Sequence, residues 1–367
     1  MRNRIPKAFL LTSAFIVLNA GALWADDDDK PVQTNLVSDI ANLAKITDPE
    51  LVNPWGVSKG PTSPFWVSNQ GKSTSTLYAV TDETSVTKVN INPPNGFVAI
   101  PITAAGPQGP TGQVFNGNQS SFPVGHGGNG HPAFFIFADL NGQISAWDGG
   151  PTAIVQVTGA AGSVYTGLAI NGAQTRLYAA NDSLGRVDVF DSTFTPVNLG
   201  SNAFRDAYLP GGLVPFNVRD IGGDVYVTYA PAGHAAQTKA EPGAGAVVVF
   251  DEDGKFIKEL IVGGRLAAPW GIALAPAGFR GFSNKLLVGN FSYLHSEINA
   301  YDPTNGRHHG TITIDTGGHP AGGLWMLDFG IGGNNGSPDV LYFTDGINRE
   351  ADGLFGALVS HERERER

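Results

Sequence analysis

Two observations predict an all-β fold for this chain: a strand pattern that recurs about six times and a composition rich in turn residues. Glycine accounts for 49 and proline for 24 of the 367 residues, and only 15% are charged, which is typical of many short strands joined by tight turns. The chain has no cysteine, so disulfides are excluded and the apolar core must stabilise the fold. The pattern predicts a six-bladed β-propeller with four-stranded antiparallel blades.

The repeat is clearest at its start, where proline, an aromatic residue and glycine open a strand. The fullest copy begins with Ala268-Pro269-Trp270-Gly271, and the first copy begins with Asn53-Pro54-Trp55-Gly56. Each copy continues with runs rich in β-branched and aromatic residues, bounded by Gly, Pro, Asn or Asp, as expected for half-buried antiparallel strands. The copies are spaced roughly 40 to 60 residues apart, near the period of a four-stranded blade.

Ring closure and blade number follow from the two least regular parts of the pattern. Thr34–Val37 is the best candidate for a strand that completes the blade ending near Leu358, because propellers normally close by pairing the two termini. The segment from Val89 to Val124 is long enough to hide an irregular unit, which makes seven blades the alternative. A β-sandwich is the competing architecture, but it does not predict a recurring Pro-Trp-Gly opening.

The termini differ from the repeat in composition. Residues 1–25 resemble a secretory signal, with a basic leader, an apolar run over 8–23 and Ala25 before an acidic cluster. An uncleaved anchor is the alternative, although the run of roughly sixteen residues is short for a bilayer. We expect an acidic linker at 26–33, one propeller domain at 34–360 and a charged tail at 361–367. The mature protein is then exported to the periplasm or beyond, with no stable membrane insertion after cleavage.

The net charge of −10 makes nucleic acid an unfavourable partner. We therefore expect a small-molecule, glycan or protein ligand.

Polar residues recur where the second strand of a blade ends. Because equivalent repeat positions lie on one ring around the axis, these side chains can face one another at one mouth of the channel. Hard cations such as Ca²⁺ take oxygen ligands of this kind, so calcium is the one cofactor that the pattern suggests. The same residue types at strand ends also commonly bond the backbone of their own turn, and this explanation stays open. The candidate metal ligands are Asn69, Asp139, Asn181, Asn290 and Asp345.

Aromatic residues near the strand starts provide a second candidate site. Trp55, Phe216, Trp270 and Trp325 can form an apolar collar at the channel mouth, and His319 lies close to Trp325 in the sequence. Aromatic faces suit sugars, peptides and apolar small molecules. Packing between blades explains the same aromatic residues equally well.

Other histidines are weaker candidates. The pairs His126/His131 and His308/His309 lie in loops or turns and do not supply the three or four ligands that a metal site needs. His234 is most simply a hydrogen-bonded loop residue, with general-base catalysis as the alternative. Sequence motifs for a nucleophile elbow, a zinc protease, a phosphate loop and a dinucleotide fold are absent.

The Pro-Trp-Gly-Ile opening, the Leu-Leu-Val-Gly-Asn strand at 286–290 and the segment Gly-His-Pro-Ala-Gly-Gly-Leu-Trp at 318–325 resemble an uncharacterised family of exported bacterial propellers. Some members of that family carry a Pro-Glu-Pro sorting tail, which this chain lacks. The blade pattern is more remotely similar to propellers of the NHL-repeat and gluconolactonase type. Lactonases of that type place Asn or Asp at inner strand starts around calcium, whereas this chain has Trp55, Thr166, Phe216, Trp270 and Gly323.

Two functional hypotheses follow. The first is an exported binding or scaffold propeller that holds a small molecule, glycan or protein at the channel mouth. The alternative is a calcium-dependent hydrolase or lyase, in which the Asn/Asp ring holds the ion and a histidine moves protons.

Overall fold

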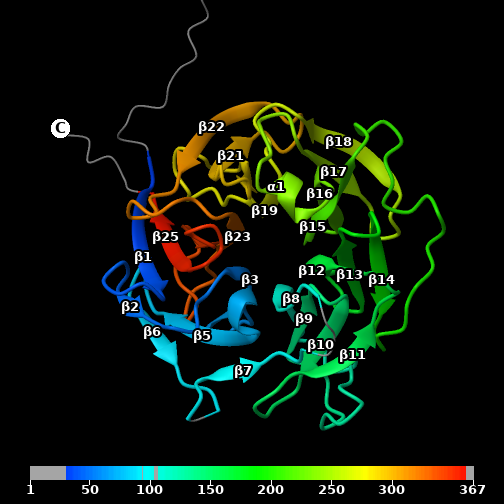
Figure 1. Cartoon of the computed structure of the whole chain (residues 1–367), viewed down its shortest axis with the longest axis vertical. Coiled ribbons are helices and arrows are strands. Elements are labelled where there is room, and N and C mark those ends of the chain that lie inside the picture. The colour runs from blue at the N-terminus through cyan, green and yellow to red at the C-terminus, as the bar shows by residue number, and fades with distance from the viewer. Residues whose placement is uncertain (1–29, 93, 103–105, 361–367) are drawn as a thin grey trace, which may run out of the picture.

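Six small antiparallel sheets form blades around a central axis (Figure 1). The computed structural model describes residues 30–92, 94–102 and 106–360. Within each blade, one strand lies next to the axis and the others follow outward towards the rim. The prediction of an all-β, six-bladed propeller is therefore confirmed.

The first three blades follow one another along the chain. Blade 1 contains β3 (Pro54–Ser58), β4 (Phe65–Asn69), β5 (Thr74–Val80) and β6 (Val86–Val89), with β7 (Phe97–Ala99) also paired to β5. Blade 2 contains β8 (Pro110–Phe115), β9 (Phe135–Asp139), β10 (Gln143–Trp147) and β11 (Ile154–Thr158). Blade 3 contains β12 (Tyr165–Ile170), β13 (Arg176–Asn181) and β14 (Arg186–Asp191). A bridge between Phe190 and Pro196 continues its outer edge.

The second half of the ring has the same order. Blade 4 contains β15 (Leu213–Ile221), β16 (Asp224–Pro231), β17 (Ala246–Phe250) and β18 (Phe256–Val262). Blade 5 contains β19 (Pro269–Leu274), β20 (Leu286–Asn290), β21 (Glu297–Tyr301) and β22 (His308–Thr313). Blade 6 contains β23 (Leu324–Phe329), β24 (Val340–Asp345), β25 (Leu354–Val359) and β1 (Val32–Ser38), with β2 (Ile46–Thr47) beside β1. Two short helices, η2 (Gln70–Lys72) and α1 (His234–Gln237), lie in loops.

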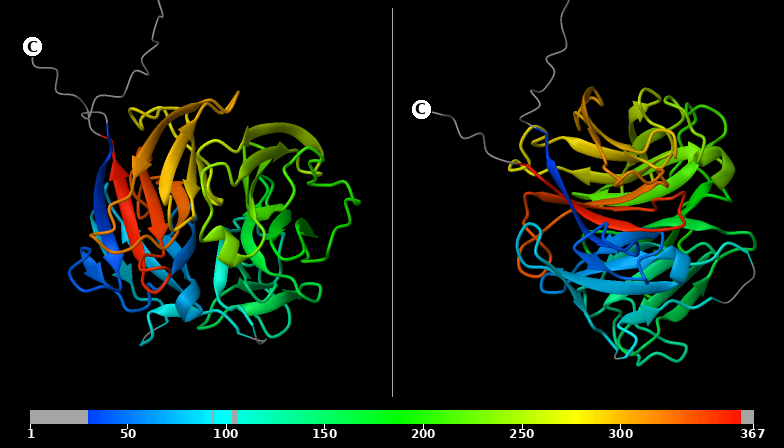
Figure 2. Two further views of the ribbon diagram at one scale, coloured as in Figure 1. Left: turned by 45° about the horizontal axis from the view of Figure 1, so that its top comes forward. Right: turned by 60° about the vertical axis from the view of Figure 1, so that its left-hand side comes forward.

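The ring closes by pairing the N-terminal strand with the last strand. β1 runs antiparallel to β25, with Thr34 opposite Ala357 and Val37 opposite Phe355. Both views in Figure 2 show the blue β1 beside the red β25. The predicted closure is confirmed, and the segment between Val89 and Val124 adds β7 to blade 1 and supplies β8 to blade 2 without forming a seventh blade.

The inner strands explain why the repeat carries glycine after the aromatic residue. The pairing register shifts at this point in every inner strand, which indicates a β-bulge. A Cβ atom on Gly56 would lie 2.4 Å from Thr111 O, and one on Gly271 would lie 2.3 Å from Trp325 O. Adjacent inner strands therefore approach too closely for a side chain, which is how the repeated glycine contributes to the ring.

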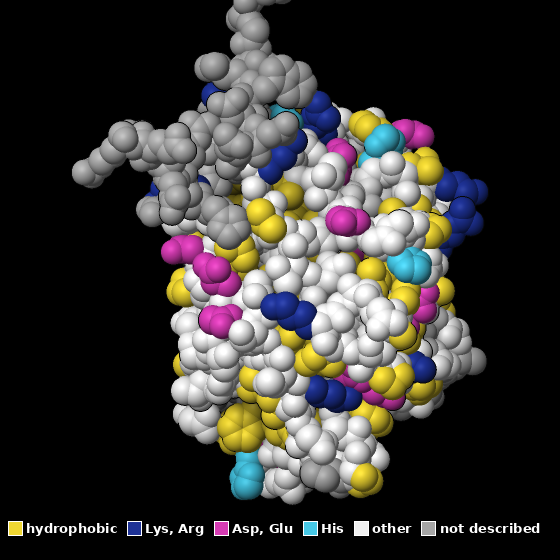
Figure 3. Space-filling model, turned by 90° about the vertical axis from the view of Figure 1, so that its left-hand side faces the viewer, with side chains coloured by type: hydrophobic (Ala, Val, Ile, Leu, Met, Phe, Trp, Pro, Cys, Tyr) yellow, Lys and Arg dark blue, Asp and Glu magenta, His cyan; other side chains and the backbone are white. Residues whose placement is uncertain are grey.

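Apolar side chains fill the spaces between adjacent blades. Six buried clusters each combine residues of two neighbouring blades, such as Phe65 and Phe355 between blades 1 and 6. A seventh cluster lies on the axis and contains Trp55, Trp270 and Trp325. On the outer wall drawn in Figure 3, charged and histidine side chains are scattered among uncharged ones over the part formed by described residues.

The predicted signal (1–25), residues 26–29 of the linker and the charged tail (361–367) lie outside the described residues. Within the described part of the chain, no helix has the length and apolar character needed to span a bilayer.

Candidate functional site

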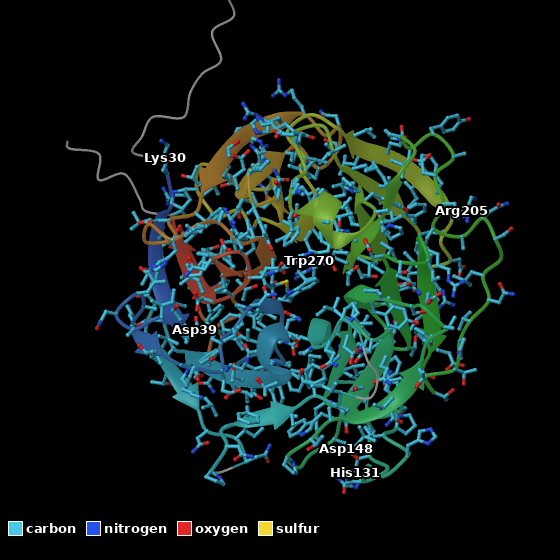
Figure 4. All side chains as sticks on the ribbon, viewed as in Figure 1. Lys30, Asp39, His131, Asp148, Arg205 and Trp270 are labelled. Carbon is cyan, nitrogen blue, oxygen red and sulfur yellow. The ribbon has the colours of Figure 1, made fainter. Side chains whose placement is uncertain are left out.

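A cluster of three tryptophans closes the centre of the channel. Trp55 stacks on Trp325 with ring centroids 3.5 Å apart, and Trp270 meets both of them edge-on at 6.0 and 5.6 Å. The Trp270 Nε1–H donates to Thr166 O of blade 3 at 2.8 Å, which carries its ring across the axis (Figure 4). The three rings, here called the aromatic plug, are at most 3% exposed. They divide the channel into two cavities that share no lining residue.

The larger cavity, of about 730 Å³, lies at the end of the ring where the inner strands begin, which we call the first mouth. Its apolar lining includes Trp55, Leu140 and Phe216, and its polar lining comes mainly from loops. The cavity is large enough for a drug-sized molecule and combines an apolar wall with a few polar groups, as small-molecule sites generally do.

Glu350 is the centre of the polar lining. Its Oε2 accepts hydrogen bonds from Tyr293 OH and His234 Nε2–H, both at 2.5 Å, and its Oε1 accepts from Asn53 Nδ2 at 3.1 Å. These residues come from blades 6, 5, 4 and 1, so four blades converge on one carboxylate. The Glu350 side chain is only 13% exposed, which strengthens these hydrogen bonds relative to those in water.

The loop that presents Glu350 has an unusual backbone. Asn348, Arg349 and Glu350 are consecutive and all adopt left-handed conformations, with φ of 55°, 57° and 68°. This conformation costs about 1–2 kcal/mol for each residue other than glycine. Such strain is concentrated at functional sites, where the surrounding contacts hold it in place.

The partners of Glu350 have shifted proton affinities. The hydrogen bond to Glu350 raises the pKa of His234, against a smaller opposing effect of burial, so the imidazole stays protonated to higher pH. Burial raises the pKa of Tyr293 well above its usual range, and the neighbouring carboxylate adds to this shift. Tyr293 therefore remains a hydrogen-bond donor at neutral pH.

A second carboxyl group lines the first mouth beside α1. Asp182 follows β13 in blade 3 and accepts a hydrogen bond from Gln237 Nε2 of α1 at 2.6 Å. Burial raises the pKa of Asp182 to about 6, although the bond from Gln237 works in the other direction. Above this pH, the mouth carries two carboxylates around an apolar floor.

Amides complete the lining from the remaining blades. Asn53 Nδ2 also donates to Gln70 Oε1 at 2.7 Å, and Gln70 Nε2 donates to Gln108 O at 2.6 Å. At the floor, Trp55 Nε1 is buried without a hydrogen-bond acceptor among the described residues. An acceptor atom of a bound molecule would satisfy this donor.

The aromatic residues predicted to bind ligand lie at different depths. Trp55 and Phe216 line the first mouth, whereas Trp270 lines the cavity on the other side of the plug. Trp325 is fully buried inside the plug, where its Nε1–H donates to Asn53 Oδ1. His319 lines neither cavity and instead bonds Asn348 through Nδ1. These aromatics therefore form core packing, and Trp55, Phe216 and Trp270 also line a cavity.

One expected strand start is shifted in register. Leu324 pairs with Asp345 as Pro54 pairs with Asn69, so Trp325 is the equivalent of Trp55. The sequence comparison with lactonases had placed Gly323 there, and that alignment was wrong by two residues. The corrected alignment makes the inner strands more aromatic than expected.

The five predicted calcium ligands all lie at the first-mouth ends of their second strands, but none lines the cavity. Asn69 Nδ2 donates to the hydroxyls of Thr74 and Thr76 within its own blade. Asp139 Oδ1 accepts from the backbone N–H of Asn141 in the adjacent turn.

The other two asparagines bond the segment that leads into their own inner strand. Asn181 Oδ1 accepts from Val164 N–H, and Asn290 Oδ1 accepts from Ala267 N–H. The structure thus does not bring the predicted set together as cation ligands. Across residues 30–92, 94–102 and 106–360, no three His, Asp or Glu side chains converge in a metal-binding group.

Asp345 differs from its four equivalents. It is fully buried, and neither carboxylate oxygen has a hydrogen-bond partner among the described residues. Burial raises its pKa from 3.8 to about 7. This residue is a source of pH-dependent stability.

Sequence reasoning missed Glu350, Tyr293, Asp182 and Gln70 as site residues. The repeated polar position at the end of the second strand lies one residue before the position that lines the cavity. Asn69 and Asn181 end their strands, and Gln70 and Asp182 follow them directly. Successive side chains of a strand point to opposite sides, so the next residue can face the mouth when the strand-end residue faces its own blade. Glu350 and Tyr293 lie further along the loops that follow the second strands of blades 6 and 5, at positions where the repeat has no recurring residue type.

Comparison with known proteins assigns the family. The chain is 30% identical over 349 residues to "Uncharacterized protein L690" of Acanthamoeba polyphaga mimivirus, covering 89% of this chain and 85% of the viral protein. It belongs to the L690 family. A second mimivirus protein, "Uncharacterized protein R648", is 28% identical over 342 residues, covering 89% and 80% of the two chains. No protein-family model matches.

These relatives correct the resemblance drawn from sequence motifs. The L690 family is represented by mimivirus proteins, so the assignment to an exported bacterial family is wrong. The Pro-Trp-Gly and Leu-Leu-Val-Gly-Asn motifs that suggested it describe strand packing in the ring, which propellers of different origin can share. Among solved structures, Kuenenia stuttgartiensis hydrazine synthase aligns with a TM-score of 0.50 and 15% identity, covering 83% of this chain and 76% of that one. This likeness concerns the fold.

Proposed function

We propose that the protein is a binding propeller whose first mouth holds a small molecule with an apolar body and a hydrogen-bond-donating head group, such as an amine. The observation that carries the proposal is Glu350, held over a cavity of about 730 Å³ by residues of three other blades. A carboxylate fixed in this way is pre-organised to accept from a ligand, which lowers the entropy lost on binding.

The charges of the mouth favour an amine over an acid. Glu350 and Asp182 both line the cavity, and their negative charges repel anionic head groups. His234 is the one ionisable group of opposite sign in the lining, and its ring nitrogen is already bonded to Glu350. Trp55, Leu140 and Phe216 provide the apolar surface for the rest of the ligand. If the ligand were a glycan or a protein segment, its uncharged hydroxyl or amide groups would donate to the carboxylates of Glu350 and Asp182 in place of an amine.

The pair formed by His234 and Glu350 supports a second candidate, a hydrolase or lyase. A carboxylate that orients an imidazole is a common arrangement for general acid–base catalysis. The Nε2 atom of His234 faces Glu350, so Nδ1 is the nitrogen left to exchange a proton with a substrate. A calcium-dependent version has less support, because the five strand-end residues bond their own blades or lie buried away from the cavity.

Calorimetric titration with three isosteric probes tests the binding proposal. Benzylamine, benzyl alcohol and benzoate share one ring and differ in the charge of the head group. We expect saturable binding in the order benzylamine, benzyl alcohol, benzoate. Benzoate binding as tightly as benzylamine would contradict the proposed ligand class, and no binding by any probe would contradict the site. Heat on calcium titration would favour the calcium-dependent alternative.

Two variants locate the binding site. Glu350→Gln keeps the side-chain size and removes the charge, so benzylamine should bind at least about tenfold more weakly. The matched control Glu83→Gln changes an exposed carboxylate in a surface turn and should leave the affinity unchanged. If the two variants bound benzylamine with equal affinity, the probe would not bind at Glu350.

A further inference from the structure

The cavity on the other side of the aromatic plug, which we call the second mouth, is chemically distinct from the first. It has a volume of about 280 Å³ and lies at the ends of the inner strands. Trp270 and Met326 form its boundary with the plug. Its charged lining residues are Lys59, Arg219, Asp220 and Asp328. The smaller volume suits a compact polar molecule.

Three charged side chains meet across this cavity from blades that are not all neighbours. Arg219 of blade 4 donates through Nη2 to Asp328 Oδ1 of blade 6 at 2.7 Å, and through Nη1 to Leu327 O at 3.1 Å. Lys59 of blade 1 donates to Asp328 Oδ2. The side chains of Lys59, Asp328 and Arg219 are 9%, 13% and 28% exposed. The buried ammonium of Lys59 and the half-buried guanidinium of Arg219 therefore share one carboxylate.

The cluster has one positive charge more than it can neutralise internally. Burial lowers the pKa of Lys59, and the neighbouring Asp328 carboxylate opposes this shift only in part. Lys59 has three N–H donors, and Asp328 is the one hydrogen-bond acceptor seen for it in the described structure. Asp220 also lines this cavity, but its Oδ1 accepts from Gly223 N–H, and among the described residues the ion pairs of Lys59 and Arg219 are made with Asp328.

Three buried polar atoms in the same lining have no hydrogen-bond partner among the described residues. They are Asp220 Oδ2, together with Ser58 Oγ and Gln113 Oε1 in residues that are 7% and 5% exposed. The amide nitrogen of the Gln113 side chain is held in place, because Nε2 donates to Gly56 O at 2.9 Å and to Trp66 O at 2.5 Å. Buried polar atoms are rarely left unpaired, since each costs about 1–3 kcal/mol. A ligand with both an acceptor and a donor would satisfy them.

We propose that the second mouth binds a small hydroxycarboxylate, whose carboxylate lies between Lys59 and Arg219 and whose hydroxyl donates to Gln113 Oε1. The carboxylate neutralises the excess positive charge and accepts from the unused ammonium donors. The hydroxyl distinguishes this ligand from a simple acid. The site is independent of the first mouth, because the aromatic plug separates the two cavities.

Calorimetric titration of the whole chain with glycolate, acetate and inorganic phosphate tests this assignment. We expect saturable binding of glycolate, weaker binding of acetate and the weakest binding of phosphate. A result in which acetate equals glycolate would overturn the role of Gln113, and one in which phosphate binds most tightly would overturn the ligand class. If neither carboxylate binds up to about 50 mM, the proposal is wrong.

Two variants place the glycolate in the second mouth. Lys59→Met removes the ammonium while Arg219 still pairs with Asp328, so glycolate affinity should fall at least about tenfold. The matched control Lys88→Met removes another lysine of blade 1 that pairs with buried Asp48 at the outer edge, and it should bind as the parent does. Ser58→Ala is the second variant and removes a hydroxyl that has no hydrogen-bond partner among the described residues, so the fold is retained and affinity should fall about threefold. Unchanged affinity in Ser58→Ala and Lys59→Met would contradict the location.

Discussion

The two mouths of the channel are built on the same six inner strands and carry opposite chemistry. At the first mouth, the ionisable groups Glu350, Asp182 and His234 come from loops after the second strands. At the second mouth, Arg219 and Asp328 lie within inner strands, and Lys59 directly follows one. Loops are free of the ring's packing constraints, whereas inner-strand residues must fit between blades. We therefore expect variants of the second mouth to affect stability more than variants of the first.

The largest effect is expected for Asp328→Ala. Removal of the shared carboxylate leaves the buried Lys59 and the half-buried Arg219 without their ion-pair partner, which should lower the free energy of unfolding by about 3–5 kcal/mol. Chemical denaturation measures this change. The control Asp339→Ala alters an exposed carboxylate and should shift the free energy by less than about 0.5 kcal/mol. Similar small losses in both variants would show that the cluster is not a buried network.

The next effect concerns Asp345, which belongs to neither mouth. Its pKa is 3.8 when unfolded and about 7 when folded, so between these values the folded protein retains a proton that the unfolded chain releases. The free energy of unfolding should therefore fall as pH rises from about 4 to 7. Asp345→Asn removes this cost and should stabilise the protein by about 2–4 kcal/mol at pH 8, with little change at pH 4.

The matched control for this prediction is Asp139→Asn at the equivalent position of blade 2. Asp139 accepts a backbone hydrogen bond from Asn141, and burial raises its pKa only to about 6. Its stabilisation at pH 8 should be smaller than that of Asp345→Asn. Denaturation curves of both variants across pH measure the difference, and a destabilised Asp345→Asn would argue against an unpaired carboxylate.

A smaller effect on stability is expected from the close packing of adjacent inner strands, which support both mouths. Gly56→Ala places a Cβ atom 2.4 Å from Thr111 O in the next blade, so the free energy of unfolding should fall by about 1–3 kcal/mol. Gly172→Ala is the control, since its Cβ would have no atom within 4 Å. Equal stability of these two variants in denaturant would mean that the inner strands can separate freely.

The smallest effect is expected at the first mouth. The raised pKa of His234 makes its pairing with Glu350 stabilising below the unfolded pKa of 6.5, and this contribution is lost as pH rises through the folded pKa. His234→Gln should remove this pH dependence. Because the side chain is 60% exposed, the effect should stay below about 1 kcal/mol.

The repeat predicted the ring but only part of the sites. Periodic strands, the closing strand Thr34–Val37 and the aromatic inner strands follow from local pattern, and all three are present in the fold. Glu350 and Tyr293 could not be predicted in this way, because their meeting depends on how loops from different blades fold over the mouth. Arg219 and Asp328 could have been predicted, because they are charged residues at a repeat position that is apolar in three other blades. The register places both at one repeat position, where blades 2, 3 and 5 have Val114, Ala169 and Ala273.

The central claim is that one ring presents two separate sites of opposite ligand preference. Calorimetric cross-titration of Glu350→Gln and Lys59→Met with benzylamine and glycolate tests it most directly. Glu350→Gln should weaken benzylamine binding alone, and Lys59→Met should weaken glycolate binding alone, each by at least about tenfold. If either variant weakened the binding of both ligands, the separation of the two mouths by the aromatic plug would be contradicted. The same holds if both variants bound both ligands as the parent does.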